Sequence, residues 1–473
     1  MDPLRSEIYR ILSEEFSVPW EEISDELGPG DLSKWDSIGQ IRLIARLEET
    51  FHLQFAVSDM ISMNHVKEIV ETIRKRLPKE SKKETSPLRK KVFQHGIKTS
   101  PLRLPRRTHW GEGSLSALSS LERSRVAVVT GSSAYAAALQ KKARSFLSGR
   151  TVSFIQKPPR ETTEGWVHEL AKELEAFSPD AIVALGGGSS IDGAKLGWVL
   201  YEHPTLNLEE FFTPFTLPPL RKKAILIAVP TTFGTGAEVS SAATYSKEGE
   251  LGKSILVSHE LLPDQSILDP GLGQGTPLPI VYASAFDALT HAIEGYVSIV
   301  RNPLIEPYAV LAVRTILSAL GELLEAKKLS KEILWGLATS SYYAGIVQNH
   351  CSVGLTHSFA HQLGSFGLAH GQANALFLSA VMTSNAEKAP HRYETLAAGC
   401  GFRSHSEMIA SVAGLTKAAP FHPDHETWEK LSRHRSSIVE GAMKDITFKT
   451  NPVSFDQPTL ERIFGDLLQR WKP

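Results

Sequence analysis

The sequence predicts a multidomain protein: a small all-helical unit, then an α/β domain with a doubly wound parallel sheet, then an all-helical domain. Three observations predict this order. Apolar residues recur at helical spacing in the first 77 residues or so, strands and helices alternate from about 96 to 275, and strand signals end at about 276. A chain of 473 residues exceeds one ordinary domain. Its 42% hydrophobic and 22% charged residues are typical of a globular protein with a full core.

Charge and composition exclude several classes of function. The formal net charge of -1 gives no basic field, so we expect no nucleic-acid and no membrane partner. No stretch approaches 18 consecutive apolar residues, and the amphipathic, acidic N-terminus does not resemble a signal peptide. The two cysteines, Cys351 and Cys400, offer neither a disulfide framework nor a CxxC metal site. These features predict a cytoplasmic protein.

The N-terminal unit, residues 1–77, is predicted to be helical. A loop with Gly28, Pro29 and Gly30 follows the first helix, the next helix runs from Ile38 to Phe51, and the last runs from about 66 to 77. Residues 1–80 hold 16 acidic and 10 basic side chains, so the acidity of the chain is local to this unit. The first helix is predicted by apolar residues at helical spacing: Ile8, Ile11, Leu12 and Phe16.

Residues 78–95 form a charged stretch that has no apolar periodicity and that contains Pro78 and Pro87. Proline disrupts a helix interior, so we interpret the stretch as a flexible linker and not as a continuation of the preceding helix.

The α/β domain, residues 96–275, is predicted from short apolar runs at 125–130, 181–185 and 224–229, which are typical of buried parallel strands. A helical stretch, 164–177, separates the first two runs. Long helical segments fill residues 276–473. A helical domain packed on an α/β domain leaves a cleft, which is a common place for a small-molecule site.

A glycine-rich turn follows the second of these strands. Glycines let the backbone approach a diphosphate closely, and the N-terminus of the following helix supplies unpaired N–H groups. A second polar turn, at 230–238, carries the hydroxyls of Thr231 and Thr232. Together the two turns predict nucleotide binding. The first turn comprises Gly186, Gly187, Gly188 and Ser189, and Asp192 lies in the helix that it opens.

Two residue pairs at i, i+4 spacing suggest a metal site. Asp287 and His291 form the first pair, His357 and His361 form the second, and His370 follows nine residues later. Side chains at i and i+4 share one face of a helix, so each pair can aim at one point. Either pair alone could consist of ordinary helix residues. Three imidazoles with a carboxylate suit Fe²⁺ or Zn²⁺, and the combination predicts a metal-dependent enzyme.

Residues 96–473 resemble the iron-containing (group III) alcohol dehydrogenases, which are related in fold to dehydroquinate synthase. The shared motifs occur in the family's order: the glycine turn, Pro230-Thr-Thr-x-Gly-Thr-Gly-x-Glu238, Asp269-Pro270, the residues from Asp287 to Glu294, the histidine cluster, and 445–452. The resemblance implies a dehydroquinate-synthase-like fold and often a homodimer.

The resemblance also implies a role for each matching position. His361 would lie beside the nicotinamide on the proton path. The glycine turn, Thr231 and Thr232 would bind the cofactor, with Lys253 as a weaker candidate. The metal ligands would be Asp287, His291, His357 and His370. Family members commonly have ten residues of spacing between the last two histidines, whereas here it is nine, which could displace His370 by several ångströms and weaken metal binding.

Cofactor preference is suggested by the residues at the end of the first strand, Gly131, Ser132 and Ser133. An acidic residue there would hydrogen-bond a ribose 2′-hydroxyl and repel a 2′-phosphate, and none is present. Glycine and serine at this position resemble the family's NADP pattern, so NADP(H) is favoured over NAD(H). The alternative is that these residues simply form a turn.

Residues 4–77 resemble an acyl carrier protein, because Asp36-Ser37-Ile38 heads a helix as Asp-Ser-Leu does in that four-helix family. The resemblance implies that Ser37 carries 4′-phosphopantetheine. A phosphopantetheinyl transferase and separate acyl-loading and acyl-releasing enzymes would then be partners. The alternative is that Asp-Ser is a plain helix cap. Ser33 is the nearest other hydroxyl.

Taken together, the two resemblances predict a metal- and NADPH-dependent reductase of an aldehyde or ketone in an acyl group carried on Ser37. A linker of roughly 18 residues would hold that group at an effective concentration on the order of millimolar. Three alternatives remain open. The larger part could be a lyase or cyclase like dehydroquinate synthase, it could be a non-catalytic docking scaffold for the carrier, or the two parts could act on unrelated substrates.

Overall fold

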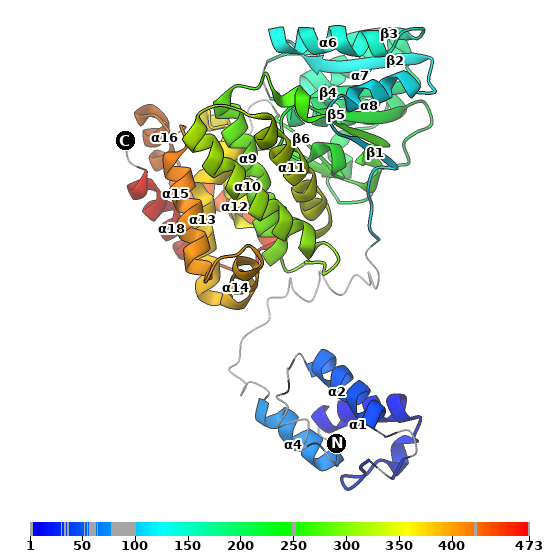
Figure 1. Cartoon of the computed structure of the whole chain (residues 1–473), viewed down its shortest axis with the longest axis vertical. Helices are drawn as coiled ribbons and strands as arrows, with labels where there is room; N and C mark the ends of the chain where they lie inside the picture. The colour runs from blue at the N-terminus through cyan, green and yellow to red at the C-terminus, as the bar shows by residue number, and fades with distance from the viewer. Residues whose placement is uncertain are drawn as a thin grey trace. The chain divides into compact units, whose positions relative to one another are not determined.

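The computed structural model divides into two compact units, Met1–Lys98 and Thr99–Pro473, both drawn in Figure 1. The residues that the structure describes are 3–29, 31–32, 35, 37–51, 53, 55, 63, 65–76, 101–159, 161–247, 252–420 and 423–471. The stretch 78–95, predicted to be a linker, lies outside the described residues.

The described part of the first unit is helical. It contains α1 (Pro3–Phe16), a 3₁₀ helix η1 (Trp20–Glu22), α2 (Ser37–Phe51) and α4 (Val66–Arg76), so the three predicted helices are confirmed. Their apolar faces meet in one core, in which the buried Trp35 stacks on Phe16 with ring centroids 4.9 Å apart. A four-helix carrier bundle stays a prediction, because the described residues of this unit contain three α-helices.

A six-stranded parallel sheet forms the first part of the second unit. Its order is β1-β8-β5-β4-β2-β3, and β6 and β7 pair separately as an antiparallel ribbon. The strands are β1 (Arg107–Trp110), β2 (Arg125–Gly131), β3 (Thr151–Lys157), β4 (Ala181–Gly186), β5 (Ile225–Pro230), β6 (Ala242–Tyr245), β7 (Ser254–Val257) and β8 (Gln265–Leu268).

The three apolar runs identified in the sequence are the central strands β2, β4 and β5. The edge strands β1 and β3 gave no such signal, because several of their side chains are exposed and their sequences contain no continuous apolar run. The change from strands to helices falls between Leu268 and Leu278.

Helices cover both faces of the sheet (Figure 1). Along β2, Val126 and Val128 pack with η2 (Ser114–Ser120) and α6 (Ala134–Phe146). The alternate residues Ala127 and Val129 pack with α7 (Glu164–Phe177) and α8 (Gly188–Glu202). Side chains of a strand alternate between faces, so this division confirms the predicted doubly wound arrangement.

All the regular secondary structure among the described residues after Leu268 is helical. The α-helices are α9 (Leu278–Val297), α10 (Glu306–Ala326), α11 (Lys331–Cys351), α12 (Leu355–Ala360), α13 (His370–Lys388), α14 (Pro390–Gly399), α15 (His405–Ala418), α16 (His425–Arg433), α17 (Arg435–Lys444) and α18 (Gln457–Arg470). Helix α9 is apolar on nearly every side because it packs against α10, α11 and α13 at once. No described helix is long and apolar enough to span a membrane.

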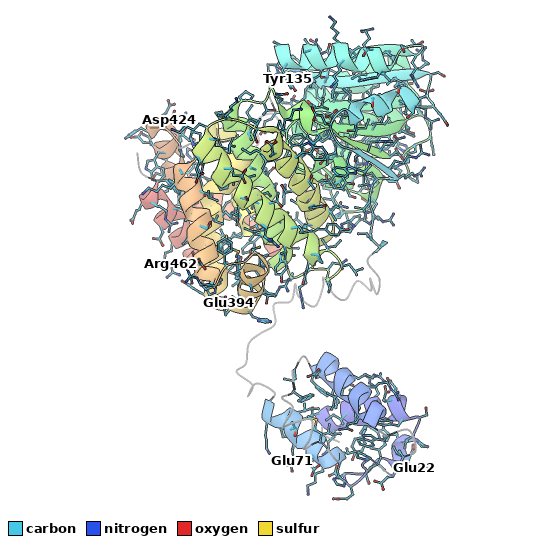
Figure 2. The ribbon with its side chains drawn as sticks, in the orientation of Figure 1. Glu22, Glu71, Tyr135, Glu394, Asp424 and Arg462 are labelled. Atoms are coloured by element: carbon cyan, nitrogen blue, oxygen red, sulfur yellow. The ribbon has the colours of Figure 1, made fainter. Side chains whose placement is uncertain are left out.

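Hydrogen bonds hold the segment between β8 and α9 against the α/β part. The hydroxyl of Tyr135, labelled in Figure 2, donates a hydrogen bond of 2.8 Å from α6 to the carbonyl of Leu272, shortly before α9. Asp269, from the Asp-Pro motif, accepts hydrogen bonds from the backbone of Gly113 at 3.1 Å and of Leu115 at 3.3 Å. These contacts fix the segment that leads from β8 into α9 at the carboxyl end of the sheet.

Candidate metal and cofactor site

The carboxyl ends of β2 and β4 mark a topological switch point. From β2 the chain continues to β3 on one side, then returns to β4 on the other side and moves on to β5. In register, Thr130 lies beside Leu185, and Gly186 lies beside Pro230. Ligands of open α/β sheets bind at such a point. The two predicted turns therefore lie at the edge of the sheet where a nucleotide is expected to bind.

The glycine turn and the threonine turn pack directly on each other. Gly187 is the N-cap of α8, where no side chain caps the helix, and a Cβ atom on Gly188 would lie 2.5 Å from Cγ2 of Thr235. A Cβ on Gly187 would lie 3.0 Å from Oγ1 of Thr232. The missing side chains therefore permit this close approach, and they leave the N-terminus of α8 open to a diphosphate.

The threonine turn also packs against the helix that carries the first metal-ligand pair. A Cβ on Gly234 would lie 2.4 Å from the carbonyl oxygen of Ser284 in α9, three residues before Asp287. The two turns predicted to bind the nucleotide and the predicted metal ligands therefore lie next to each other in the folded chain.

The four predicted metal ligands converge on one point. The Nε2 atoms of His291, His357 and His370 lie 3.7, 3.7 and 3.5 Å from Oδ1 of Asp287. The ligand atoms of Asp287, His291 and His357 all lie within 4.8 Å of one another. The nine-residue spacing does not displace His370 from the other predicted ligands, because α13 begins at His370 itself.

The protonation chemistry of the cluster suits a cation. Burial alone raises the pKa of Asp287, but His291, His370 and His357 face it and hold that pKa well below its usual range. Burial lowers the pKa of His291 to about 4, which leaves a neutral imidazole. Nδ1 of His370 is buried without a hydrogen-bond partner in the described part of the chain. Burial lowers the pKa of His357, but the carboxylates of Asp287 and Glu294 face it and raise that pKa to about 9, so a bound cation would take the place of a proton there. Three imidazole nitrogens and one carboxylate fit Fe²⁺ or Zn²⁺.

Glu294 orients one of these ligands, a role that the sequence analysis did not assign. Its carboxylate accepts a hydrogen bond from Nδ1 of His357 at 2.7 Å and from the backbone N–H of Thr356 at 2.6 Å. The Nδ1 proton is therefore fixed, and Nε2 is the ring nitrogen that faces Asp287. Glu294 lies seven residues after Asp287 on the same face of α9, and that periodicity was the available signal.

Comparison with known proteins decides the family. A sequence model described as iron-containing alcohol dehydrogenase matches residues 105–270, and a second, for the C-terminal part of that family, matches residues 281–468. The chain belongs to the iron-containing alcohol dehydrogenase family. It is accordingly an oxidoreductase that uses a divalent metal and NAD(P), and not a lyase or a docking scaffold.

Relatives of this dehydrogenase cover the second unit. The chain is 30% identical over 377 residues to an NADPH-dependent butanol dehydrogenase from Clostridium saccharobutylicum, over 76% of this chain and 96% of that protein. It is 33% identical to an alcohol dehydrogenase from Thermococcus barophilus, over 75% and 94%. The iron-containing alcohol dehydrogenase of Thermococcus thioreducens superposes with a TM-score of 0.72 at 30% identity, covering 78% of this chain and 100% of the other.

His361 of this dehydrogenase lies beside the metal ligands, with a carboxylate that holds it in place. Its Nδ1 lies 2.8 Å from Oδ2 of Asp445, and its ring stacks on that of His370 with centroids 5.3 Å apart. The other oxygen of Asp445 accepts hydrogen bonds of 2.8 Å from the backbone and the hydroxyl of Thr447. Asp445 opens the family motif at 445–452, but nothing in the sequence indicates its contact with His361.

Two predicted cofactor residues have partners within the protein. Asp192 accepts hydrogen bonds from the backbone N–H and the hydroxyl of Thr244, at 3.1 and 2.9 Å, which joins α8 to β6. Lys253 forms an ion pair of 2.9 Å with Glu161. Their roles in cofactor binding stay predictions, and the geometry gives each of them a second role in holding the fold.

The residues at the end of β2 lie at the switch point, as the cofactor prediction requires. Gly131 ends β2 and pairs in register with Lys157 of β3. Ser132 is exposed, while the hydroxyl of Ser133 caps α6 by accepting a hydrogen bond of 3.1 Å from the backbone of Ala136. Ser133 therefore has the turn role that the sequence analysis kept as an alternative, which leaves Gly131 and Ser132 as the residues most open to a ribose.

Proposed function

We propose that this alcohol dehydrogenase reduces an aldehyde or ketone in an acyl group carried as a thioester on Ser37 of its own N-terminal unit, with NADPH as the reductant. The observation that carries the catalytic half of the proposal is the convergence of three Nε2 atoms on Oδ1 of Asp287, next to His361. The observation that carries the carrier half is that α2 begins at Ser37.

Each site residue has a defined task in this reaction. Asp287, His291, His357 and His370 would hold the metal. When bound, the metal supplies Lewis acidity to the carbonyl oxygen, and NADPH supplies the hydride. His361 delivers the proton that completes the alcohol from Nε2, since its Nδ1 is held by Asp445. The carboxylate of Asp445 keeps the ring in one orientation.

The preference for NADP(H) rests on the end of β2. Gly131 and Ser132 present no carboxylate to a ribose 2′-phosphate. The relative from Clostridium saccharobutylicum is named as NADPH-dependent, which supports the same choice.

The carrier proposal draws on the position and surroundings of Ser37. The helix N-terminus at Ser37 favours the negative charge of a phosphodiester. Trp35, two residues earlier, is buried in the core and donates a hydrogen bond to Gln40 in α2, so the approach to the helix is fixed. The surface of the unit carries exposed acids such as Glu22 and Glu71, both labelled in Figure 2, as a carrier that recruits basic partner enzymes would.

The proposal requires partners. A phosphopantetheinyl transferase would modify Ser37, and separate enzymes would load and release the acyl group.

The carrier half is tested by intact-protein mass spectrometry after incubation with coenzyme A and a promiscuous phosphopantetheinyl transferase. We expect the wild type to gain one phosphopantetheine mass and Ser37→Ala to gain none, with Ser33→Ala as the matched control that still gains it. Absence of any gain in the wild type would overturn the carrier assignment, and free aldehydes would then be the substrates to test. A protein loaded with a 3-oxoacyl group should next oxidise NADPH in stoichiometric amount.

A further inference from the structure

A buried amide, Asn374, lies among the metal ligands, and no role has yet been assigned to it. It follows His370 by one turn of α13, and its side chain is fully buried. Its Nδ2 lies 2.8 Å from Oδ1 of Asp287, 3.3 Å from Nε2 of His357 and 3.4 Å from Nε2 of His370. These distances are shorter than the 3.5–3.7 Å that separate the histidine nitrogens from that carboxylate oxygen.

The atom nearest to this amide is a hydrogen-bond acceptor. Oδ1 of Asp287 is a carboxylate oxygen, and Nδ2 of Asn374 donates to it at 2.8 Å. An amide N–H₂ group is therefore attracted to this oxygen when no cation is bound beside it. The oxygen at the other end of the same amide, Oδ1 of Asn374, is buried and has no partner among the described residues.

A divalent cation would reverse this preference. The positive charge would repel the N–H₂ group and attract the amide oxygen, and Coulomb interactions are strong in a buried site. The two ends of a carboxamide have nearly the same shape, so a half-turn about its terminal bond exchanges them without moving neighbouring atoms.

We propose that Asn374 is a fifth protein group of the metal site, which turns its oxygen toward the metal when the site is loaded and its N–H₂ toward Asp287 when it is empty. This inference rests on the metal-dependent chemistry proposed above. A fifth ligand favours Fe²⁺, which accepts more than four ligands, over Zn²⁺, which prefers four. Asn374 is then a determinant of metal selectivity.

The test uses the full-length protein stripped of metal and titrated with Fe²⁺ under anaerobic conditions, with Zn²⁺ and with Co²⁺. In Asn374→Leu, which keeps the branched shape of the side chain and removes the oxygen, we expect Fe²⁺ affinity to fall about tenfold or more. Zn²⁺ affinity should fall less. The d–d absorption of bound Co²⁺ should become stronger in Asn374→Leu, because four-coordinate Co²⁺ absorbs more than five-coordinate Co²⁺.

Asn374→Asp keeps the oxygen and removes the N–H₂ donor. It should retain the wild-type Co²⁺ spectrum and bind metal at least as tightly. Its empty form should melt at a lower temperature than the empty wild type, since two carboxylates then face each other.

The matched control is Asn385→Leu, also a buried asparagine of α13, which bonds to Tyr393 and Asn451. It should lower the melting temperature and leave metal affinity and the Co²⁺ spectrum unchanged. Identical Co²⁺ spectra and identical Fe²⁺-to-Zn²⁺ affinity ratios in the wild type and Asn374→Leu would overturn the role of Asn374 alone. A wild type that binds none of the three metals would overturn the metal-dependent function as well.

Discussion

Two buried clusters of charged side chains in the second unit can be compared. They differ in whether their polar atoms have hydrogen-bond partners. In the first, Asp287 faces three histidines, and Nδ1 of His370 and Oδ1 of Asn374 have no partner in the described structure. In the second, Lys195 donates to the carbonyls of Ser240 and Ala242 at 2.7 and 2.9 Å.

The carboxylate of Asp192 in the second cluster is likewise occupied, by Thr244. Both clusters are buried, and both have shifted pKa values, so neither burial nor a shifted pKa marks a site by itself. The first cluster differs because its acceptors face one another, and such an arrangement is stable only with a cation or a donor between them. The predictions below test whether that difference separates function from stability.

The largest effect is expected when the first cluster loses a ligand. His357→Ala removes an imidazole nitrogen and leaves Glu294 without its partner. Lewis-acid stabilisation of several kcal/mol corresponds to a loss of about 10³-fold in kcat/KM, and bound metal measured by elemental analysis should fall with it. Phosphopantetheinylation of Ser37 should persist in this variant. Retained activity would contradict the metal assignment.

The second cluster should affect stability and not chemistry. Burial raises the pKa of Glu238, next to Lys195, to about 7. A raised carboxyl pKa contributes stability that is present below the unfolded value of 4.5 and lost as the pH rises through 7.

Glu238→Gln stays neutral at every pH, so its stability relative to the wild type should grow by up to about 3 kcal/mol between pH 4.5 and pH 8. Denaturant unfolding at the two pH values measures this change. The metal content of the protein should not change. A changed metal content would contradict the assignment of the second cluster to stability alone.

A smaller effect is expected where a satisfied pair supports the first cluster. Glu294→Gln keeps the shape of the side chain but weakens the hydrogen bond that fixes the His357 tautomer. Changes of this kind typically cost about 10- to 100-fold in metal affinity, which competition with a chelator would measure. An unchanged affinity would show that the backbone alone positions His357.

The smallest effect is expected at the end of β2, where we propose that the cofactor binds and where neither cluster lies. Ser132→Asp introduces a carboxylate at the exposed end of β2, where we place the ribose 2′-phosphate. At an exposed position this repulsion should raise KM for NADPH roughly five- to tenfold and leave KM for NADH within about twofold. Equal effects on both cofactors would contradict the proposed position of the 2′-phosphate.

The sequence alone determined the features that depend on local spacing. The apolar runs of β2, β4 and β5 predicted the central strands, and the i, i+4 pairs predicted which side chains aim together. The order of motifs also predicted the family that the comparisons establish. These predictions succeed because strand alternation and helical periodicity are properties of a few consecutive residues.

Only the tertiary structure decided how distant segments meet. Spacing suggested that His370 could be displaced, yet the start of α13 brings it 3.5 Å from Asp287. The partnerships of Glu294 with His357, of Asp445 with His361 and of Asn374 with Asp287 join segments that are far apart in the chain. No local pattern encodes these contacts, because they arise when α9, α12, α13 and the segment after α17 pack against one another.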